Sequence, residues 1–89
     1  SASLFLILAQ ARPDREAAAV LAEVVRIRPH AWPNLRLVEL GDAILGRDGT
    51  LVAAAVDRYR AMLERRPKLR EAMAKLGRSR ELAAADSTP

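Results

Sequence analysis

The chain contains no cysteine, a single histidine and only three aromatic residues in 89 positions. Without cysteine the sequence offers neither a disulfide nor a thiolate metal site, and one histidine alone does not make a metal or catalytic centre. The sequence therefore predicts no metal, no cofactor and no enzymatic activity. The absence of cysteine is compatible with cytoplasmic and extracytoplasmic locations alike, so the compartment stays open, with the cytoplasm slightly favoured.

The chain also lacks a long hydrophobic run. The apolar run at residues 4–9 is much shorter than the ~20 apolar residues that cross a bilayer, so no membrane span is predicted. This run would make the first helix apolar on most sides, and such a helix is expected to be buried. Two interpretations are open: the helix folds back on the helices that follow, or a second copy or missing segment covers it. The candidate oligomer contacts are Leu4, Phe5, Leu6 and Ile7.

Glycine is sparse, and Ala, Leu, Arg and Glu are abundant, which favours helix throughout. Prolines at 13, 29 and 67 divide the chain, because proline lacks the backbone donor that a continuing helix needs. The sequence predicts an all-α protein with five helices, at residues 3–12, 14–28, 34–45, 50–66 and 69–84. Asn34 and Thr50 are the expected caps of the third and fourth helices, and Gly46 is expected to end the third. Trp32, in the connector before the third helix, is expected to cover the core. Residues 85–89 form a polar tail, and residues 1–84 form one helical domain.

Within these helices a spaced pattern of large and small residues recurs. The first part of the pattern is a Leu-Gly pair with an apolar residue three positions before the Leu. The second part is an Ala followed four residues later by a large residue and, further along, by a Pro. The instances are Leu37-x2-Leu40-Gly41-x2-Ile44, Ala55-x3-Tyr59 with Pro67, Met73-x2-Leu76-Gly77, and Ala17-x3-Leu21 with Pro29. The pattern resembles the tetratricopeptide repeat. The resemblance implies a short right-handed solenoid of about five antiparallel helices, roughly two and a half repeats.

In such a stack, Gly41 and Gly77 would each let a neighbouring helix approach where a Cβ would clash. The helical spacing places Leu37, Leu40, Gly41 and Ile44 on the core side of the third helix. The family's function is to bind proteins, so the resemblance implies a non-enzymatic scaffold. Its ligand would be a peptide or an amphipathic helix of a partner protein.

The resemblance also implies that the first helix of each pair lines a concave groove. The groove residues are Leu35, Val38, Asp42 and Leu45 on the third helix, and Ala74 and Arg78 on the fifth. The alternative interpretation is that Leu35, Val38 and Leu45 complete the core of a short array, since a chain of this size has little surface to spare.

The net charge is +4, and between Arg58 and Arg80 nine basic residues face two acidic ones. This basic segment suggests a nucleic-acid-associated module as an alternative function. We do not expect it to be the main one, because no aromatic residues alternate with the cations to stack on bases. A second alternative is a unit whose role is homodimerisation through the first helix.

Overall fold

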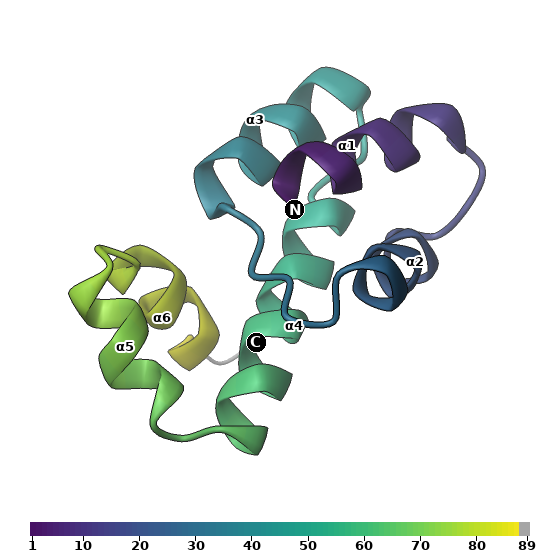
Figure 1. Cartoon of the computed structure of the whole chain (residues 1–89). Helices are drawn as coiled ribbons and strands as arrows, with labels where there is room; N and C mark the ends of the chain where they lie inside the picture. Colours follow the sequence, from purple (N-terminus) through teal and green to yellow (C-terminus); the bar gives the residue numbers. More distant parts are fainter. Residues whose placement is uncertain (88–89) are drawn as a thin grey trace. The chain divides into compact units, whose positions relative to one another are not determined.

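A computed structural model describes residues 1–87 of the chain (Figure 1). Within this range the protein is all-helical, as predicted, and has no strand. The helices are α1 (Ala2–Ala11), α2 (Ala17–Ile27), α3 (Leu35–Leu45), α4 (Thr50–Arg65), α5 (Leu69–Lys75) and α6 (Ser79–Asp86). The number of helices described is therefore six, where the sequence pattern predicts five.

The predicted helix ends hold where proline sets them. α1, α2 and α4 each end two residues before a proline, at Pro13, Pro29 and Pro67, because the residue before proline disfavours helical backbone. α3 begins after Asn34, whose side chain accepts a hydrogen bond from the Leu37 amide at 3.1 Å. This is the predicted cap, and it satisfies one of the free amides of the first turn.

The predicted fifth helix is in fact two helices, α5 and α6, with a turn at Gly77 between them. Gly77 has a backbone φ of 77°, a conformation that costs residues with a Cβ roughly 1–2 kcal/mol. The Arg78 amide donates to the Met73 carbonyl at 2.8 Å, and the Gly77 amide donates to Ala74 at 3.2 Å. These two bonds form a Schellman motif, which ends a helix.

Gly77 is therefore not a packing glycine inside a helix, and that prediction was wrong. A Cβ at Gly77 would have no atom within 4 Å. A signal for the turn exists in the sequence: Leu76-Gly77-Arg78 repeats Leu45-Gly46-Arg47, and Gly46 closes α3 with the same pair of bonds. The Leu-Gly step at 76–77 thus matches the end of α3 and not the Leu40-Gly41 step in its middle.

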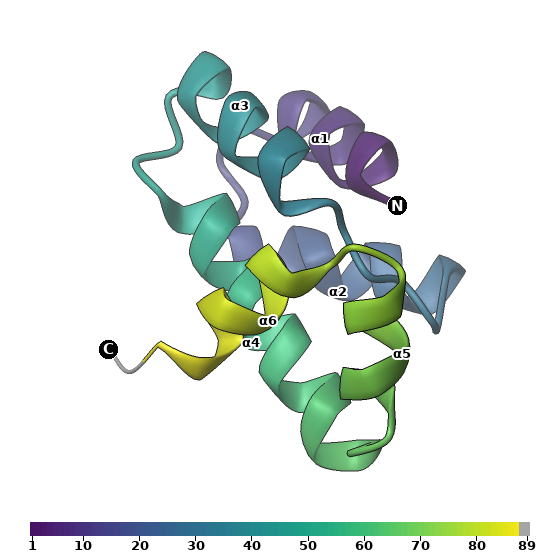
Figure 2. The ribbon, with the colours of Figure 1, turned by 90° about the vertical axis from the view of Figure 1, so that its left-hand side faces the viewer.

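By its internal contacts the chain divides into two compact units, residues 1–55 and residues from Val56 onward. In the first unit, α1 packs against α2 and α3. α1 and α3 lie side by side, as Figures 1 and 2 both show. They run parallel: Leu6 lies against Gly41, and further along both helices Arg47 bonds to the carbonyl of Ala9.

Arg47 holds the end of α1 by hydrogen bonds. Its guanidinium donates to the carbonyl oxygens of Ala9 at 2.8 Å, Arg12 at 3.0 Å and Arg15 at 2.7 Å. Carbonyls at a helix C-terminus have no partner within the helix, so a cation with five donors is well suited to satisfy several of them. The end of α1 is therefore fixed to the α3–α4 turn by hydrogen bonds from the Arg47 side chain to main-chain carbonyls, as well as by side-chain packing.

The core of the first unit consists of one face of each helix and the connector before α3. Trp32, in that connector, is buried, which agrees with a tryptophan that covers a core. The buried apolar residues of this unit are Ala2, Phe5, Ala9, Ala17, Val20, Leu21, Val24, Ala31, Trp32, Leu35, Val38, Leu51, Ala54 and Ala55.

In the second unit α5 and α6 pack against each other as a short hairpin (Figure 2). Leu82 and Ala85 of α6 are buried, whereas α5 has no buried residue. The residues predicted as a polar tail partly belong to this unit, because α6 runs to Asp86. Thr88 and Pro89 lie outside the described residues.

Candidate interaction surfaces

The four α3 residues predicted to line a groove lie on the inner side of the helix. Leu35, Val38 and Asp42 are buried, with exposed fractions of 4%, 0% and 4%, and Leu45 is half-buried. An open groove needs accessible side chains, and these three are not accessible. They form part of the core of the first unit, which was the alternative interpretation of the same residues.

Asp42 is the one charged residue among them, and its carboxylate serves the start of α4. Oδ1 accepts the Gly49 amide at 2.8 Å, and Oδ2 accepts the Leu51 amide at 2.8 Å and the Val52 amide at 3.2 Å. A carboxylate at a helix N-terminus satisfies free amides and interacts favourably with the helix dipole. Asp42 is thus a cap reached from another helix. Thr50, the cap that the sequence suggests, donates its hydroxyl to the Arg47 carbonyl instead.

Of the four α3 residues predicted to face the core, Gly41 is buried, and the other three are exposed, so the prediction was wrong for those three. Leu37, Leu40 and Ile44 have exposed fractions of 47%, 57% and 82%. α3 carries two apolar stripes, one at 35, 38, 42 and 45 and the other at 37, 40 and 44. Periodicity identifies both stripes but does not decide which is buried. The outer stripe places three large apolar side chains on one helix face, at the i, i+3 and i+7 spacing of neighbours.

α1 adds to the same side of the molecule. Of the four predicted oligomer contacts, Phe5 is fully buried, Leu4 and Leu6 are half-buried, and Ile7 is 61% exposed. Leu6 faces Gly41, and Phe5 lies toward the core. Since successive residues turn by about 100° around a helix, Ile7 lies on the side of the α1–α3 pair away from the core. We call Ile7, Leu37, Leu40 and Ile44 the outer face.

The outer face carries no charged residue. α1 contains none from Ala2 to Ala11, and the exposed stripe of α3 is leucine and isoleucine. Single exposed apolar side chains are ordinary on protein surfaces, whereas a contiguous apolar patch marks an interaction site. The three outer-face residues of α3 are neighbours on one helix, and Ile7 adds an exposed apolar side chain on the adjacent parallel helix.

The two groove residues predicted on the fifth helix lie in the second unit. Ala74 is exposed on α5. Arg78 is half-buried in the turn between α5 and α6, and its guanidinium lies 3.5 Å from the Glu81 carboxylate. Neither residue takes part in a groove within its own unit.

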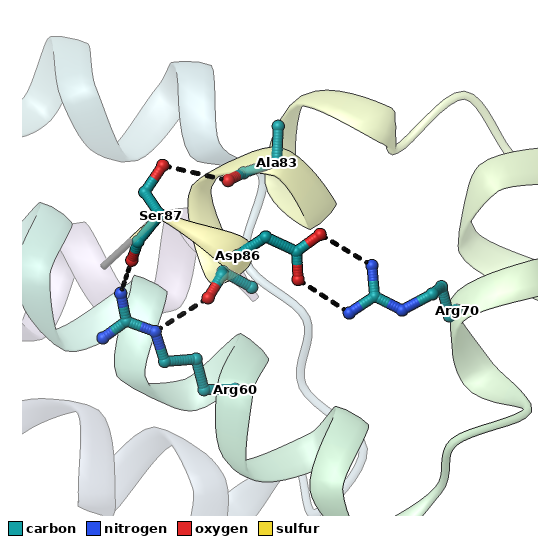
Figure 3. Close-up of polar contacts among 6 residues, drawn as sticks. Arg60, Arg70, Ala83, Asp86 and Ser87 are labelled. Atoms are coloured by element: carbon teal, nitrogen blue, oxygen red, sulfur yellow. Dashed lines mark hydrogen bonds and ion pairs between the residues drawn. The ribbon is translucent and has the colours of Figure 1, made fainter.

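The second unit has an open hollow of its own, beside the end of α6. Arg70 forms a two-pronged pair with Asp86, at 2.9 and 2.8 Å (Figure 3). Arg60 donates to the carbonyls of Ala85, at 2.8 Å, and Ser87, and so satisfies carbonyls at the C-terminus of the helix. Both guanidinium groups are thus engaged in holding α6, and we interpret the hollow as structural.

Ion pairing shifts the pKa of two carboxyl groups, those of the exposed Asp86 and the half-buried Glu23. The hydrogen bond from Arg70 lowers the pKa of Asp86, and the same bond raises the pKa of Arg70. In the first unit, the hydrogen bond from Arg12 lowers the pKa of Glu23. These shifts are explained by the ion pairs themselves, Arg70 with Asp86 and Arg12 with Glu23.

Two kinds of site, a metal centre and a membrane span, are absent from residues 1–87. No three His, Cys, Asp or Glu side chains in that range come together as metal ligands would. In the same range, no helix combines the length and the apolar character needed to cross a membrane.

No family model, curated protein or solved structure matches the chain. The tetratricopeptide resemblance therefore stays a prediction from the spacing of the motifs.

Proposed function

We propose that the chain is a non-enzymatic protein-interaction module, and that its outer face binds an amphipathic helix of a partner protein. The observation that carries the proposal is the exposure of Leu37, Leu40 and Ile44 on one stripe of α3. An amphipathic helix meets such a surface with apolar residues at the same i, i+3, i+4 and i+7 spacing. The absence of charge on the outer face favours a partner face that is also uncharged.

The size of the outer face suggests a weak complex. Full burial of an exposed Leu or Ile contributes about 1.5–3 kcal/mol, and the four side chains are already partly covered. Their total of several kcal/mol is reduced by the cost of association, which is at least about 4 kcal/mol. A dissociation constant in the high micromolar to millimolar range is expected, unless contacts beyond the outer face contribute.

We further propose that the helices follow the paired-helix arrangement of the repeat that the sequence resembles. The parallel neighbours α1 and α3, separated in sequence by α2, support this, because the first helices of successive pairs are neighbours in such a stack. The exposed motif residues Leu37, Leu40 and Ile44 depart from the family's pattern. The outer face accordingly replaces the concave groove as the proposed contact surface.

The direct test is binding of a fluorescein-labelled, 18-residue amphipathic model peptide made of leucine and glutamine, followed by fluorescence anisotropy. We expect the double variant L40Q/I44Q to bind at least tenfold more weakly than the original chain, since two central apolar contacts are lost. The matched control is I27Q/L76Q, which removes two exposed apolar residues outside the outer face and should leave binding unchanged.

Equal weakening in both double variants would contradict the proposal, because the peptide would then report general hydrophobicity. Sedimentation equilibrium of the chain without peptide tests another occupant. If the mass doubles with rising concentration and L40Q/I44Q abolishes the doubling, the outer face is covered by a second copy. That result would replace the partner helix with a homodimer.

A further inference from the structure

The net charge of the protein lies entirely in the second unit. Residues 1–55 contain six basic and six acidic residues, so their formal charge is zero. Residues 56–89 contain nine basic and five acidic residues and account for the whole +4. The apolar outer face and the excess positive charge thus belong to different units of the chain.

Several cations of the second unit pair with acids of the same unit. These pairs are Arg60 with Asp57, Arg70 with Asp86, and Arg78 with Glu81. Four other exposed cations have no carboxylate within ion-pair distance among residues 1–87. They are Arg65, Arg66, Lys68 and Lys75, which we call the basic surface.

The basic surface surrounds the turn between α4 and α5. Arg65 ends α4, Arg66 and Lys68 flank Pro67, and Lys75, seven residues after Lys68, ends α5. The helix dipole stabilises cations in the last turn of a helix, which accounts for Arg65 and Lys75. It does not account for Arg66 and Lys68, which lie outside both helices.

The local positive charge also acts on a neighbour. Burial lowers the pKa of Arg58, and the positive charge of Arg65, seven residues further along α4, lowers it further. The acids between Arg58 and Lys75 are Glu64 and Glu71, too few to balance the cations there. The basic surface is therefore a region of positive potential that attracts anions.

The apolar content of the second unit indicates the class of anion. Among the described residues of this unit, Leu76 is the one large apolar side chain that is strongly exposed. A protein interface needs a desolvated core of large side chains, and an interfacial membrane helix needs a long apolar face, whereas α5 has seven residues. Nucleic acid needs neither, because release of counterions from its phosphates can supply the affinity.

We infer that the basic surface binds the phosphate backbone of a nucleic-acid duplex without reading its sequence. A duplex is favoured over a single strand because the aromatic side chains on which unpaired bases stack are buried: Phe5, Trp32 and Tyr59 are 0%, 8% and 0% exposed. Guanidinium groups also match phosphate geometry with two parallel bonds. This inference is independent of the outer face.

The test is a salt titration of the intact chain with a fluorescein-labelled 20-base-pair DNA duplex. Four phosphate contacts predict a slope of log K against log salt of roughly −3.6. The variant R65Q/R66Q should reduce that slope by about 2 and weaken binding at least tenfold at low salt. The variant K68Q/K75Q should reduce the slope and weaken binding by similar amounts. It replaces R65Q/R66Q in the test if circular dichroism shows that R65Q/R66Q is unfolded.

The matched control is R28Q/R36Q, which removes two exposed arginines from the first unit. Unchanged duplex binding in this control supports the inference, whereas equal weakening overturns it, because net charge alone would then decide binding. Tighter binding to poly-glutamate or to phosphatidylglycerol vesicles than to the duplex also overturns it, in favour of an acidic protein or a membrane. Loss of peptide binding in L40Q/I44Q has no bearing on the outcome.

Discussion

The tightest helix contact in the first unit depends on one missing methyl group. A Cβ built on Gly41 would lie 2.2 Å from Leu6 Cδ2 and 2.9 Å from Leu6 Cγ, distances at which atoms overlap. Glycine in mid-helix costs about 1 kcal/mol relative to alanine. The close approach of α1 explains why a glycine is present here despite that cost. The predicted role of Gly41 as a packing glycine is confirmed, and Leu6 is the residue it contacts.

This contact predicts that the effect of Gly41→Ala on stability changes sign when Leu6 is replaced by alanine. Gly41→Ala alone should destabilise the protein by about 1 kcal/mol, because overpacking of roughly 1–3 kcal/mol exceeds the gain in helix propensity. In a Leu6→Ala background the space is free, so Gly41→Ala should stabilise by up to about 1 kcal/mol. Urea unfolding followed by circular dichroism measures all four free energies. Purely additive effects would show that Gly41 and Leu6 do not touch.

Residues that act within their own turn were predictable from sequence, and residues that act across turns were not. Asn34 caps the helix that follows it, and Gly46 ends the helix before it, as predicted. Asp42, predicted to lie at a groove wall, instead accepts amides seven to ten residues further along the chain. No local rule connects Asp42 with these amides, because the fold of the α3–α4 turn brings them together.

At the scale of the helix, Asp42 helps to decide which stripe of α3 faces inward. Its stripe contains Leu35 and Val38, and all three are buried. A buried carboxylate is costly unless it is hydrogen-bonded, and the α4 amides provide three bonds. Hydrophobicity alone favours burial of the stripe at 37, 40 and 44, which is the more apolar of the two. The hydrogen bonds of Asp42 to the α4 start favour burial of the stripe at 35, 38 and 42 instead, and hydrophobicity does not reveal them.

Removal of this cap should therefore be costly. Asp42→Ala is expected to destabilise the protein by roughly 2–3 kcal/mol, since it removes an N-terminal cap and leaves partly buried amides without a partner. Asp42→Asn keeps one acceptor oxygen and should cost about half as much. Thermal and urea unfolding measure both changes. Asp14→Ala, at an exposed position, is the matched control and should stay within about 0.5 kcal/mol; an equally mild Asp42→Ala would mean that the carboxylate does not cap α4.

At the scale of the molecule, composition and proline spacing were enough to predict the all-α class and the ends of most helices. The register of the third repeat was predicted wrongly, because Leu76-Gly77 by itself fits both a packing step and a helix end. Arg78, which follows Gly77 as Arg47 follows Gly46, and the positive φ of Gly77 both identify a helix end. The separation of charge and apolar surface between the units could be counted from the sequence once the unit boundary was known, and composition alone does not reveal that boundary.

Both proposed surfaces assign exposed residues to binding, and the account depends most on the orientation of α3. The most direct measurement is the paramagnetic broadening of methyl NMR signals by a soluble gadolinium chelate. We predict strong broadening for Leu37, Leu40 and Ile44 and protection for Leu35 and Val38. The reverse pattern, with Leu35 and Val38 broadened and the other three protected, would contradict the outer face and favour the concave groove.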